Sequence, residues 1–301
     1  MDGEALAQAD LSAKLDAATF KRFLSQGAVA DRARLQAASA PHAGAWLTAP
    51  ATNALGLRLL SAEFTAAVCL RLGAPFLSQE TWCPKCDQAL TRNCDHAVRC
   101  RGGGDITVRH NSLRDACFFR CLSAGLEAER EMSGLLPTDP RRRPADVFVR
   151  ACPGYGSVAL DLAVTCPLQQ SMMHDAARRP LPAAMDYEAH KFDDRQTAQR
   201  CLDQGFKLVP LVAETLGGWG PEAQGFFRQL AKATADKTGV DASVATCQLY
   251  EALGIQLQRA NARAMLASTT AQWTEHRNST TLAATSRSEA ALVLSAATPC
   301  G

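Results

Sequence analysis

Residues 143–165 decide the fold, and they read RPADVFVRACPGYGSVALDLAVT. Two alternating runs rich in β-branched residues flank the segment Pro153-Gly154-Tyr155-Gly156, which is a pattern that predicts a β-hairpin. Each predicted strand carries one acid on otherwise apolar ground, Asp146 on the first and Asp161 on the second. A buried acid needs a partner, and two acids brought together by one hairpin repel each other. We therefore expect a divalent cation to bind both carboxylates.

Side-chain alternation places Asp161 and Ala163 on one face of the second strand. A site that cleaves phosphodiester bonds needs a cation near the reacting phosphate. Position 163 is alanine, so the cation must come from another element. Lys191 is the best candidate, and Glu188 lies one helical turn before it on the same face. We expect Asp146, Asp161, Lys191 and Glu188 to be the catalytic residues.

Composition limits the class of protein. The chain has 301 residues, 47% hydrophobic and 21% charged, with a formal net charge of +2, which is typical of an ordinary globular protein. No apolar run is long enough to span a bilayer, and the acidic first residues lack the order of a secretory signal. We therefore expect an intracellular protein without a membrane partner, in which most of the twelve cysteines are buried free thiols.

Four metal-binding residue types cluster before the hairpin. Cys83 and Cys86 form a Cys-x2-Cys knuckle, and His96 and Cys100 follow it with three residues between them. Two such pairs suit tetrahedral zinc in a small, closed structural site. Cys94 is a spare that can replace His96 or take no part. The alternative is a set of unrelated core cysteines, which the polar character of the segment disfavours.

Basic residues gather on both sides of the hairpin. A helix is predicted from Asn111 or Ser112 to Ala124, with Gly125 after its end, so Arg109, His110 and Arg114 would lie near the helix start, where a phosphate can bind. The alternative is a solvated helix end. Another basic run, Arg141, Arg142 and Arg143, enters the hairpin and can contact a nucleic-acid backbone or simply face solvent.

The remaining elements give the fold class. Helices are predicted for residues 5–40, 61–72, 181–204, 222–236 and 242–276, and strands for residues 126–132 and 206–214. Pro210 indicates that the last strand lies at a sheet edge or carries a bulge. Glutamates at positions 127, 129 and 131 are predicted to face solvent, although one of them can reach the metal. The order predicts an α/β protein with a mixed sheet.

These motifs resemble the PD-(D/E)xK nucleases, and more closely the restriction-enzyme-like endonuclease domain of non-long-terminal-repeat retrotransposons and related reverse-transcriptase-linked open reading frames. The resemblance covers about residues 40–235. The segments that carry it are Ala43-Gly44-Ala45-Trp46-Leu47, the Cys-Cys-His-Cys knuckle, Arg109-His110-Asn111 with Arg114-Asp115, Arg143-Pro144-Ala145-Asp146, Leu160-Asp161-Leu162-Ala163-Val164-Thr165, Glu188-x-x-Lys191, and Pro210-Leu211-Val212-Ala213-Glu214-Thr215 with Gly217-Gly218.

The resemblance implies a PD-(D/E)xK nuclease-like mixed sheet flanked by helices, in an enzyme that nicks target DNA with a divalent metal. Asp146 and Asp161 would bind magnesium, and Lys191 would assist the attacking water or the leaving group. The zinc knuckle would help to hold DNA or the RNA–DNA of the element in the nucleus. The implied domains are a helical region (1–78), the zinc knuckle (79–101), the nuclease domain (102–238), and a C-terminal helix and flexible tail (239–301). The reverse transcriptase normally fused upstream is expected to be absent.

Two other interpretations stay open. The chain can be a catalytically inactive, zinc-dependent nucleic-acid-binding remnant of such an element. Alternatively, the two acids are only structural partners of Arg143 or Arg150. The first predicts binding without cleavage, and the second predicts a large loss of stability when Asp146 is replaced.

Overall fold

The computed structural model describes residues 8–269. It divides into two compact units, one built from residues 8–59 and 107–260 and the other from residues 60–106 and 261–269. Within the described range, no helix has the length and apolar character needed to cross a membrane. The hairpin acids belong to the first unit and the cysteine knuckle to the second.

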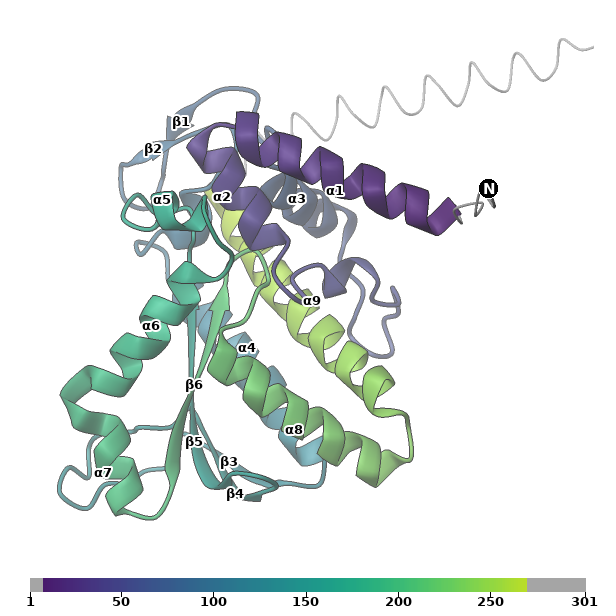
Figure 1. Cartoon of the computed structure of the whole chain (residues 1–301). Coiled ribbons are helices and arrows are strands. Elements are labelled where there is room, and N and C mark those ends of the chain that lie inside the picture. The colour runs from purple at the N-terminus through teal and green to yellow at the C-terminus, as the bar shows by residue number, and fades with distance from the viewer. Residues whose placement is uncertain (1–7, 270–301) are drawn as a thin grey trace, which may run out of the picture. The chain divides into compact units, whose positions relative to one another are not determined.

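The first unit is built on a four-stranded sheet (Figure 1). Its strands are β3 (Glu127–Arg130), β4 (Val147–Cys152), β5 (Gly156–Thr165) and β6 (Lys207–Glu214), and they lie in that order. β3, β4 and β5 are antiparallel neighbours, whereas β5 and β6 are parallel. The predicted hairpin and the mixed sheet are confirmed. β6 is an edge strand, as Pro210 indicated, and Pro210 lies opposite Asp161.

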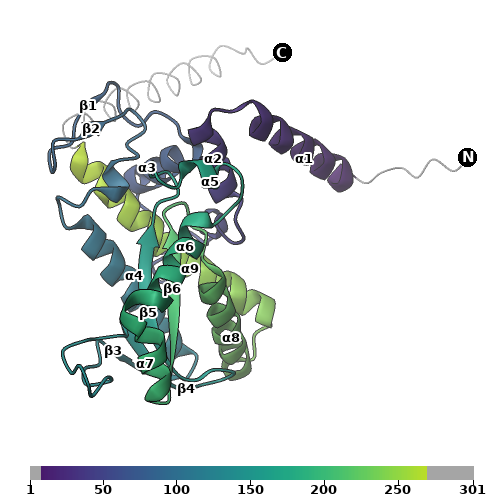
Figure 2. The same ribbon diagram turned by 60° about the vertical axis from the view of Figure 1, so that its left-hand side comes forward.

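Several helices are carried wholly or mainly by this unit. They are α1 (Gln8–Gln26), α2 (Val29–Ala38), α4 (Asp105–Ser123), α5 (Met173–Ala176), α6 (Pro182–Asp193), α7 (Thr197–Asp203), α8 (Pro221–Thr238) and α9 (Ala242–Ser268), with 3-10 turns η1 (Ala45–Leu47) and η3 (Asp194–Gln196). Both views show α6 and α7 on one face of the sheet and α8 on the other (Figure 1, Figure 2).

The side-chain alternation predicted for β5 is confirmed, because its alternate residues pack into two different hydrophobic cores, one on each face of the sheet. Leu160 and Leu162 pack with Leu113 of α4 and Phe226 of α8 on one face. The other face carries a second core, with members Leu136, Ala145, Phe148, Ala159, Cys201, Phe206 and Leu208. Asp161 has the same parity as Ala159, so it lies on the face that α6 and α7 cover.

Two predicted helices are each divided in the structure. The helix predicted for residues 5–40 breaks after Gln26, because Ala28 is extended (φ −59°, ψ 157°). The helix predicted for residues 181–204 breaks between α6 and α7, where Arg195 and Gln196 both have positive φ angles (50° and 55°). A left-handed residue cannot continue a right-handed helix, and neither residue type signals this break in the sequence.

α4 begins at Asp105, six residues before the predicted start. It ends at Ser123, one residue before the predicted end, and Gly125 is in the left-handed region as expected (φ 81°). Arg109, His110 and Arg114 therefore lie on the body of the helix and not at its start, so their predicted placement is wrong. Their binding of a phosphate stays a prediction. Thr107 and Val108 disfavour helix locally, but the packing of α4 against the sheet outweighs that preference.

The last helix is confirmed over its described length. Leu249, Leu253, Leu257 and Met265 are buried along one face of α9. The predicted end at residue 276 and the tail from Asn278 lie outside the described residues.

The second unit contains α3 (Ser61–Leu72), β1 (Thr81–Trp82), β2 (Ala89–Leu90) and the 3-10 turn η2 (Ala97–Arg99). α3 has the predicted bounds and ends at Gly73, whose left-handed conformation (φ 67°) closes the helix. β1 and β2 form a short antiparallel hairpin. This hairpin and η2 position the four predicted zinc ligands.

Candidate functional site

Cys83, Cys86, His96 and Cys100 converge in the second unit, and their ligand atoms all lie within 4.8 Å of one another. The Cys83 and Cys100 sulfurs are 3.7 Å apart, and the Cys86 sulfur lies 3.0 Å from Nε2 of His96. A Cys3His set of this size suits tetrahedral zinc. The four residues predicted from spacing therefore form a site that can bind such a metal.

Local structure explains how these ligands meet. Cys83 follows β1 and Cys86 lies in the turn of the β1–β2 hairpin, while His96 and Cys100 bracket η2. The backbone N–H of Gly102 donates to the Cys100 sulfur at 3.4 Å. Burial lowers the pKa of His96, which favours the neutral imidazole that binds metal.

Cys94 does not join this group. It is fully buried with a positive φ angle of 58°, and burial raises its pKa to about 12. Its sulfur is not among the ligand atoms that converge, so Cys94 is a small core side chain. Of the two roles left open for Cys94, the structure supports the idle one.

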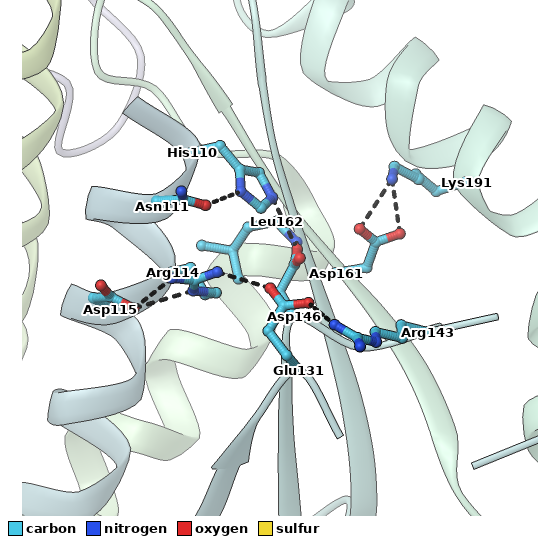
Figure 3. Close-up of polar contacts among 10 residues, drawn as sticks. All are labelled: His110, Asn111, Arg114, Asp115, Glu131, Arg143, Asp146, Asp161, Leu162 and Lys191. Carbon is cyan, nitrogen blue, oxygen red and sulfur yellow. Dashed lines mark hydrogen bonds and ion pairs between the residues drawn. The ribbon is translucent and has the colours of Figure 1, made fainter. Parts of the chain in front are cut away.

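In the first unit, Asp146 lies where β4 begins. The register pairs Val147 with Leu160, which brings the preceding residue, Asp146, opposite Asp161. One carboxylate oxygen, Oδ2, accepts the N–H of Leu162 at 2.6 Å and lies 3.1 Å from Nε2 of His110 (Figure 3). Asp146 is therefore held both by the neighbouring strand and by α4.

Lys191 of α6 contacts the second acid. Its amine lies 2.9 Å from Oδ1 and 2.8 Å from Oδ2 of Asp161, and both side chains are 23% exposed (Figure 3). Ala163, on the same strand face, is only partly buried and carries no charge. Lys191 therefore supplies the positive charge that was expected from another element, and it contacts Asp161 of the hairpin.

The charges of these groups influence one another. Burial raises the pKa of Asp161 and the Asp146 carboxylate adds to that shift, while Lys191 opposes it. Burial alone would lower the pKa of Lys191, but Asp161 outweighs it, with smaller contributions from Tyr187 and Asp146, and raises that pKa above its ordinary value. Lys191 is thus held as an ammonium ion by two carboxylates close enough to act on it together.

These two carboxylates offer oxygen ligands of the kind that magnesium prefers, although cationic side chains hold them in this structure. His110 contacts one Asp146 oxygen and Lys191 contacts both oxygens of Asp161. Within residues 8–269, the cysteine knuckle is the one group of three or more His, Cys, Asp or Glu whose ligand atoms converge as a metal site. A cation that bound both acids would share the Asp161 oxygens with the Lys191 amine or displace it.

Glu188 lies away from this ion pair. Its carboxylate accepts the N–H of Glu222 at 3.2 Å and lies against Gly220, at the start of α8. Burial raises the pKa of Glu188 to about 7. The structure thus gives Glu188, predicted to be catalytic, a helix-capping contact one turn away from Lys191.

Glu214 plays a similar part at the start of α6. The carboxylate is fully buried and accepts the N–H groups of Ala183 and Ala184 at 3.1 and 3.2 Å through one oxygen. Its other oxygen has no hydrogen-bond partner, and burial raises the pKa of Glu214 to about 7. The helix that carries Lys191 is therefore anchored to the end of β6.

The predicted DNA-binding residues differ in their exposure. Arg109 is buried, and His110 is engaged by Asp146. Arg142 is held by Asp194 at 2.7 Å and by the hydroxyl of Thr197. The others on the surface or near it are Arg141, Arg143 and Arg114, with Arg114 only 16% exposed. Only part of the predicted basic surface is available to a ligand.

The ion pairs that one interpretation of the sequence expected, between the two hairpin acids and Arg143 or Arg150, are not formed. Arg143 approaches Glu131 at 3.5 Å, and Arg150 approaches Glu129 at 3.7 Å. The acids of the hairpin contact His110 and Lys191 instead.

The sequence reasoning missed two of these contacts. It grouped His110 with phosphate-binding residues, and it treated Glu131 as one of three solvent-facing acids. Neither residue has a local signal for its partner, because both partners are more than ten residues away along the chain.

Comparisons of the chain with protein-family models, with curated proteins and with solved structures found no match.

Proposed function

We propose that this chain is a divalent-metal-dependent DNA endonuclease of the PD-(D/E)xK kind, related to those of non-long-terminal-repeat retrotransposons. The observation that carries the proposal is the contact of Lys191 with Asp161. Asp161 lies on β5, and Asp146 directly precedes the neighbouring strand, β4. Two acids at adjacent strands and one lysine on a helix beside them are the groups that metal-assisted phosphodiester hydrolysis needs.

In this proposal, Asp146 and Asp161 would hold magnesium, which would supply a positive charge to stabilise the phosphate in the transition state. Leu162 and His110 fix the orientation of Asp146 through one oxygen. Lys191 is an ammonium ion in this environment, so it donates a proton or stabilises negative charge rather than accepting a proton. We therefore propose that Lys191 protonates the leaving oxygen or stabilises its negative charge.

The partner in this proposal is DNA, in the nucleus. Arg141 and Arg143 are exposed beside the hairpin, where they can neutralise backbone phosphates. The Cys3His group supplies a small folded segment that zinc would stabilise and that would help to hold DNA.

A second candidate function is nucleic-acid binding without cleavage. It is favoured by the double contact of the Lys191 amine, which occupies both oxygens of Asp161. If no metal binds these acids, the acids and the lysine only stabilise the fold.

Two measurements on the full chain separate these functions. The first follows relaxation of supercoiled plasmid with and without added magnesium, and the second follows binding of a labelled duplex by fluorescence anisotropy. A nuclease relaxes the plasmid only with magnesium. Binding without magnesium-dependent relaxation supports the second candidate, and absence of both contradicts the proposal.

A further inference from the structure

Glu131 links two arginines that the sequence gives no reason to pair. Its Oε1 atom accepts from Nη1 of Arg114 at 2.7 Å, and its Oε2 atom lies 3.5 Å from Nη1 of Arg143 (Figure 3). Arg114 belongs to α4, whereas Arg143 belongs to the segment that enters β4. One carboxylate thus joins α4 to the approach of the hairpin.

The backbone of Glu131 is tied to the candidate site as well. Its N–H donates to the carbonyl oxygen of Asp146 at 3.0 Å, directly after β3 ends. Its φ angle is 53°, a left-handed conformation that side chains other than glycine adopt at an energetic cost. Such conformations persist where surrounding contacts determine them, and here those contacts are Arg114, Arg143 and Asp146.

The two arginines differ in how firmly they are held. Arg114 is 16% exposed and also donates to Asp115 through Nε at 3.0 Å. Asp115 in turn pairs with Arg130 at 2.8 Å. Arg143 is 56% exposed and has one longer ion pair, with Glu131. Arg114 is therefore the fixed member, and Arg143 has donors left for a ligand.

The balance of charge suits an anion. Arg114, Arg130 and Arg143 outnumber Asp115 and Glu131 by one positive charge in this network. A guanidinium presents its donors in a planar fork that matches phosphate oxygens, and Arg143 lies three residues before Asp146. Since Glu131 contacts both Arg143 and the backbone of Asp146, a phosphate bound by Arg143 would lie near the candidate metal-binding acid.

We propose that Glu131 is a positioning residue, which holds the Arg143 guanidinium beside Asp146 so that it binds a phosphate of the nucleic-acid backbone. Arg114 is the anchor of this arrangement rather than a contact of the phosphate. The inference rests on the proposed function for its choice of ligand, but it concerns binding and not cleavage.

The test compares Glu131→Gln with Glu129→Gln, a matched control two residues earlier, on β3, whose acid pairs with exposed Arg150. Binding of a short labelled duplex is measured by anisotropy without added magnesium. Either change adds one positive charge, so long-range attraction alone predicts equal or tighter binding. The proposal predicts about tenfold weaker binding for Glu131→Gln and no loss for Glu129→Gln.

A double-mutant cycle separates positioning from a general loss of structure. Arg143→Gln should weaken binding to a similar extent and lower the salt slope by about one phosphate contact. The double change Glu131→Gln with Arg143→Gln should then bind no more weakly than Arg143→Gln alone. Thermal unfolding of all variants shows whether they are folded.

The inference is overturned if Glu131→Gln binds as tightly as the unmodified chain, if the two losses simply add, or if the unmodified chain binds no duplex. Because the binding test contains no magnesium, a chain that never cleaves DNA still supports the inference if its variants lose binding as predicted. That outcome would contradict the proposed nuclease alone.

Discussion

The amine of Lys191 lies 2.9 and 2.8 Å from the two carboxylate oxygens of Asp161, across a distance of thirty residues in the chain. The helix α6 and the strand β5 are both needed to form this pair. It is the contact on which the proposed chemistry depends, because the second hairpin strand has alanine at position 163.

Replacing Lys191 with methionine should reduce magnesium-dependent cleavage by about 10²- to 10³-fold, because a preorganised charge near the reacting phosphate is lost. Lys191→Arg keeps the charge but changes its geometry, so it should recover only part of the activity. Single-turnover cleavage of a labelled duplex measures both. Wild-type rates in Lys191→Met would remove the lysine from the chemistry.

The same variant has a separate effect on stability. Lys191→Met leaves the Asp161 carboxylate without its counter-ion, which should cost about 1–2 kcal/mol, less than for a fully buried pair because both side chains are 23% exposed. The double change Lys191→Met with Asp161→Asn should recover most of that loss in urea unfolding. Additive losses would show that the two residues do not stabilise each other.

Glu214 should make stability depend on pH. Burial raises its folded pKa to about 7, above the value of the unfolded chain, so the folded state binds the proton more tightly. Its contribution is therefore fully present below about pH 4.5 and is lost as pH rises towards 7, by up to about 3 kcal/mol. Glu214→Gln should flatten this part of the urea-unfolding profile. A profile unchanged by the substitution would refute the assignment.

Metal removal tests the cysteine group. Chelation of zinc, or Cys83→Ser, should unfold the knuckle and abolish zinc binding, because the ligands and the fold depend on each other. Cys94→Ala is the matched control, since Cys94 lies outside the ligand group and should keep one zinc per chain. Elemental analysis measures the zinc content of both variants. Loss of zinc in Cys94→Ala would mean that the ligand set is different.

Parts of both units were predictable from short-range patterns. Alternation in residues 156–165 gave the hairpin and its two faces, and cysteine spacing gave the Cys3His group. The start of α4 was not predictable, because Thr107 and Val108 favour strand until the helix packs against the sheet. The break at Arg195 depends on backbone angles with no residue signature.

The site was predictable only in part for a related reason. Asp146, Asp161 and Lys191 could be chosen because an acid on an apolar strand needs a partner. The capping contact of Glu188 and the link from Glu131 to Arg114 join elements that meet only in the folded chain. The spacing of residues within the sequence does not predict such contacts.

The most direct test of the nuclease proposal is the rate at which Asp161→Asn nicks supercoiled plasmid in the presence of magnesium. Asp186→Asn is the control, since Asp186 is an exposed acid on the same helix as Lys191. The proposal predicts that the unmodified chain and Asp186→Asn nick at similar rates, and that Asp161→Asn has no magnesium-dependent activity. Equal nicking by Asp161→Asn would contradict it.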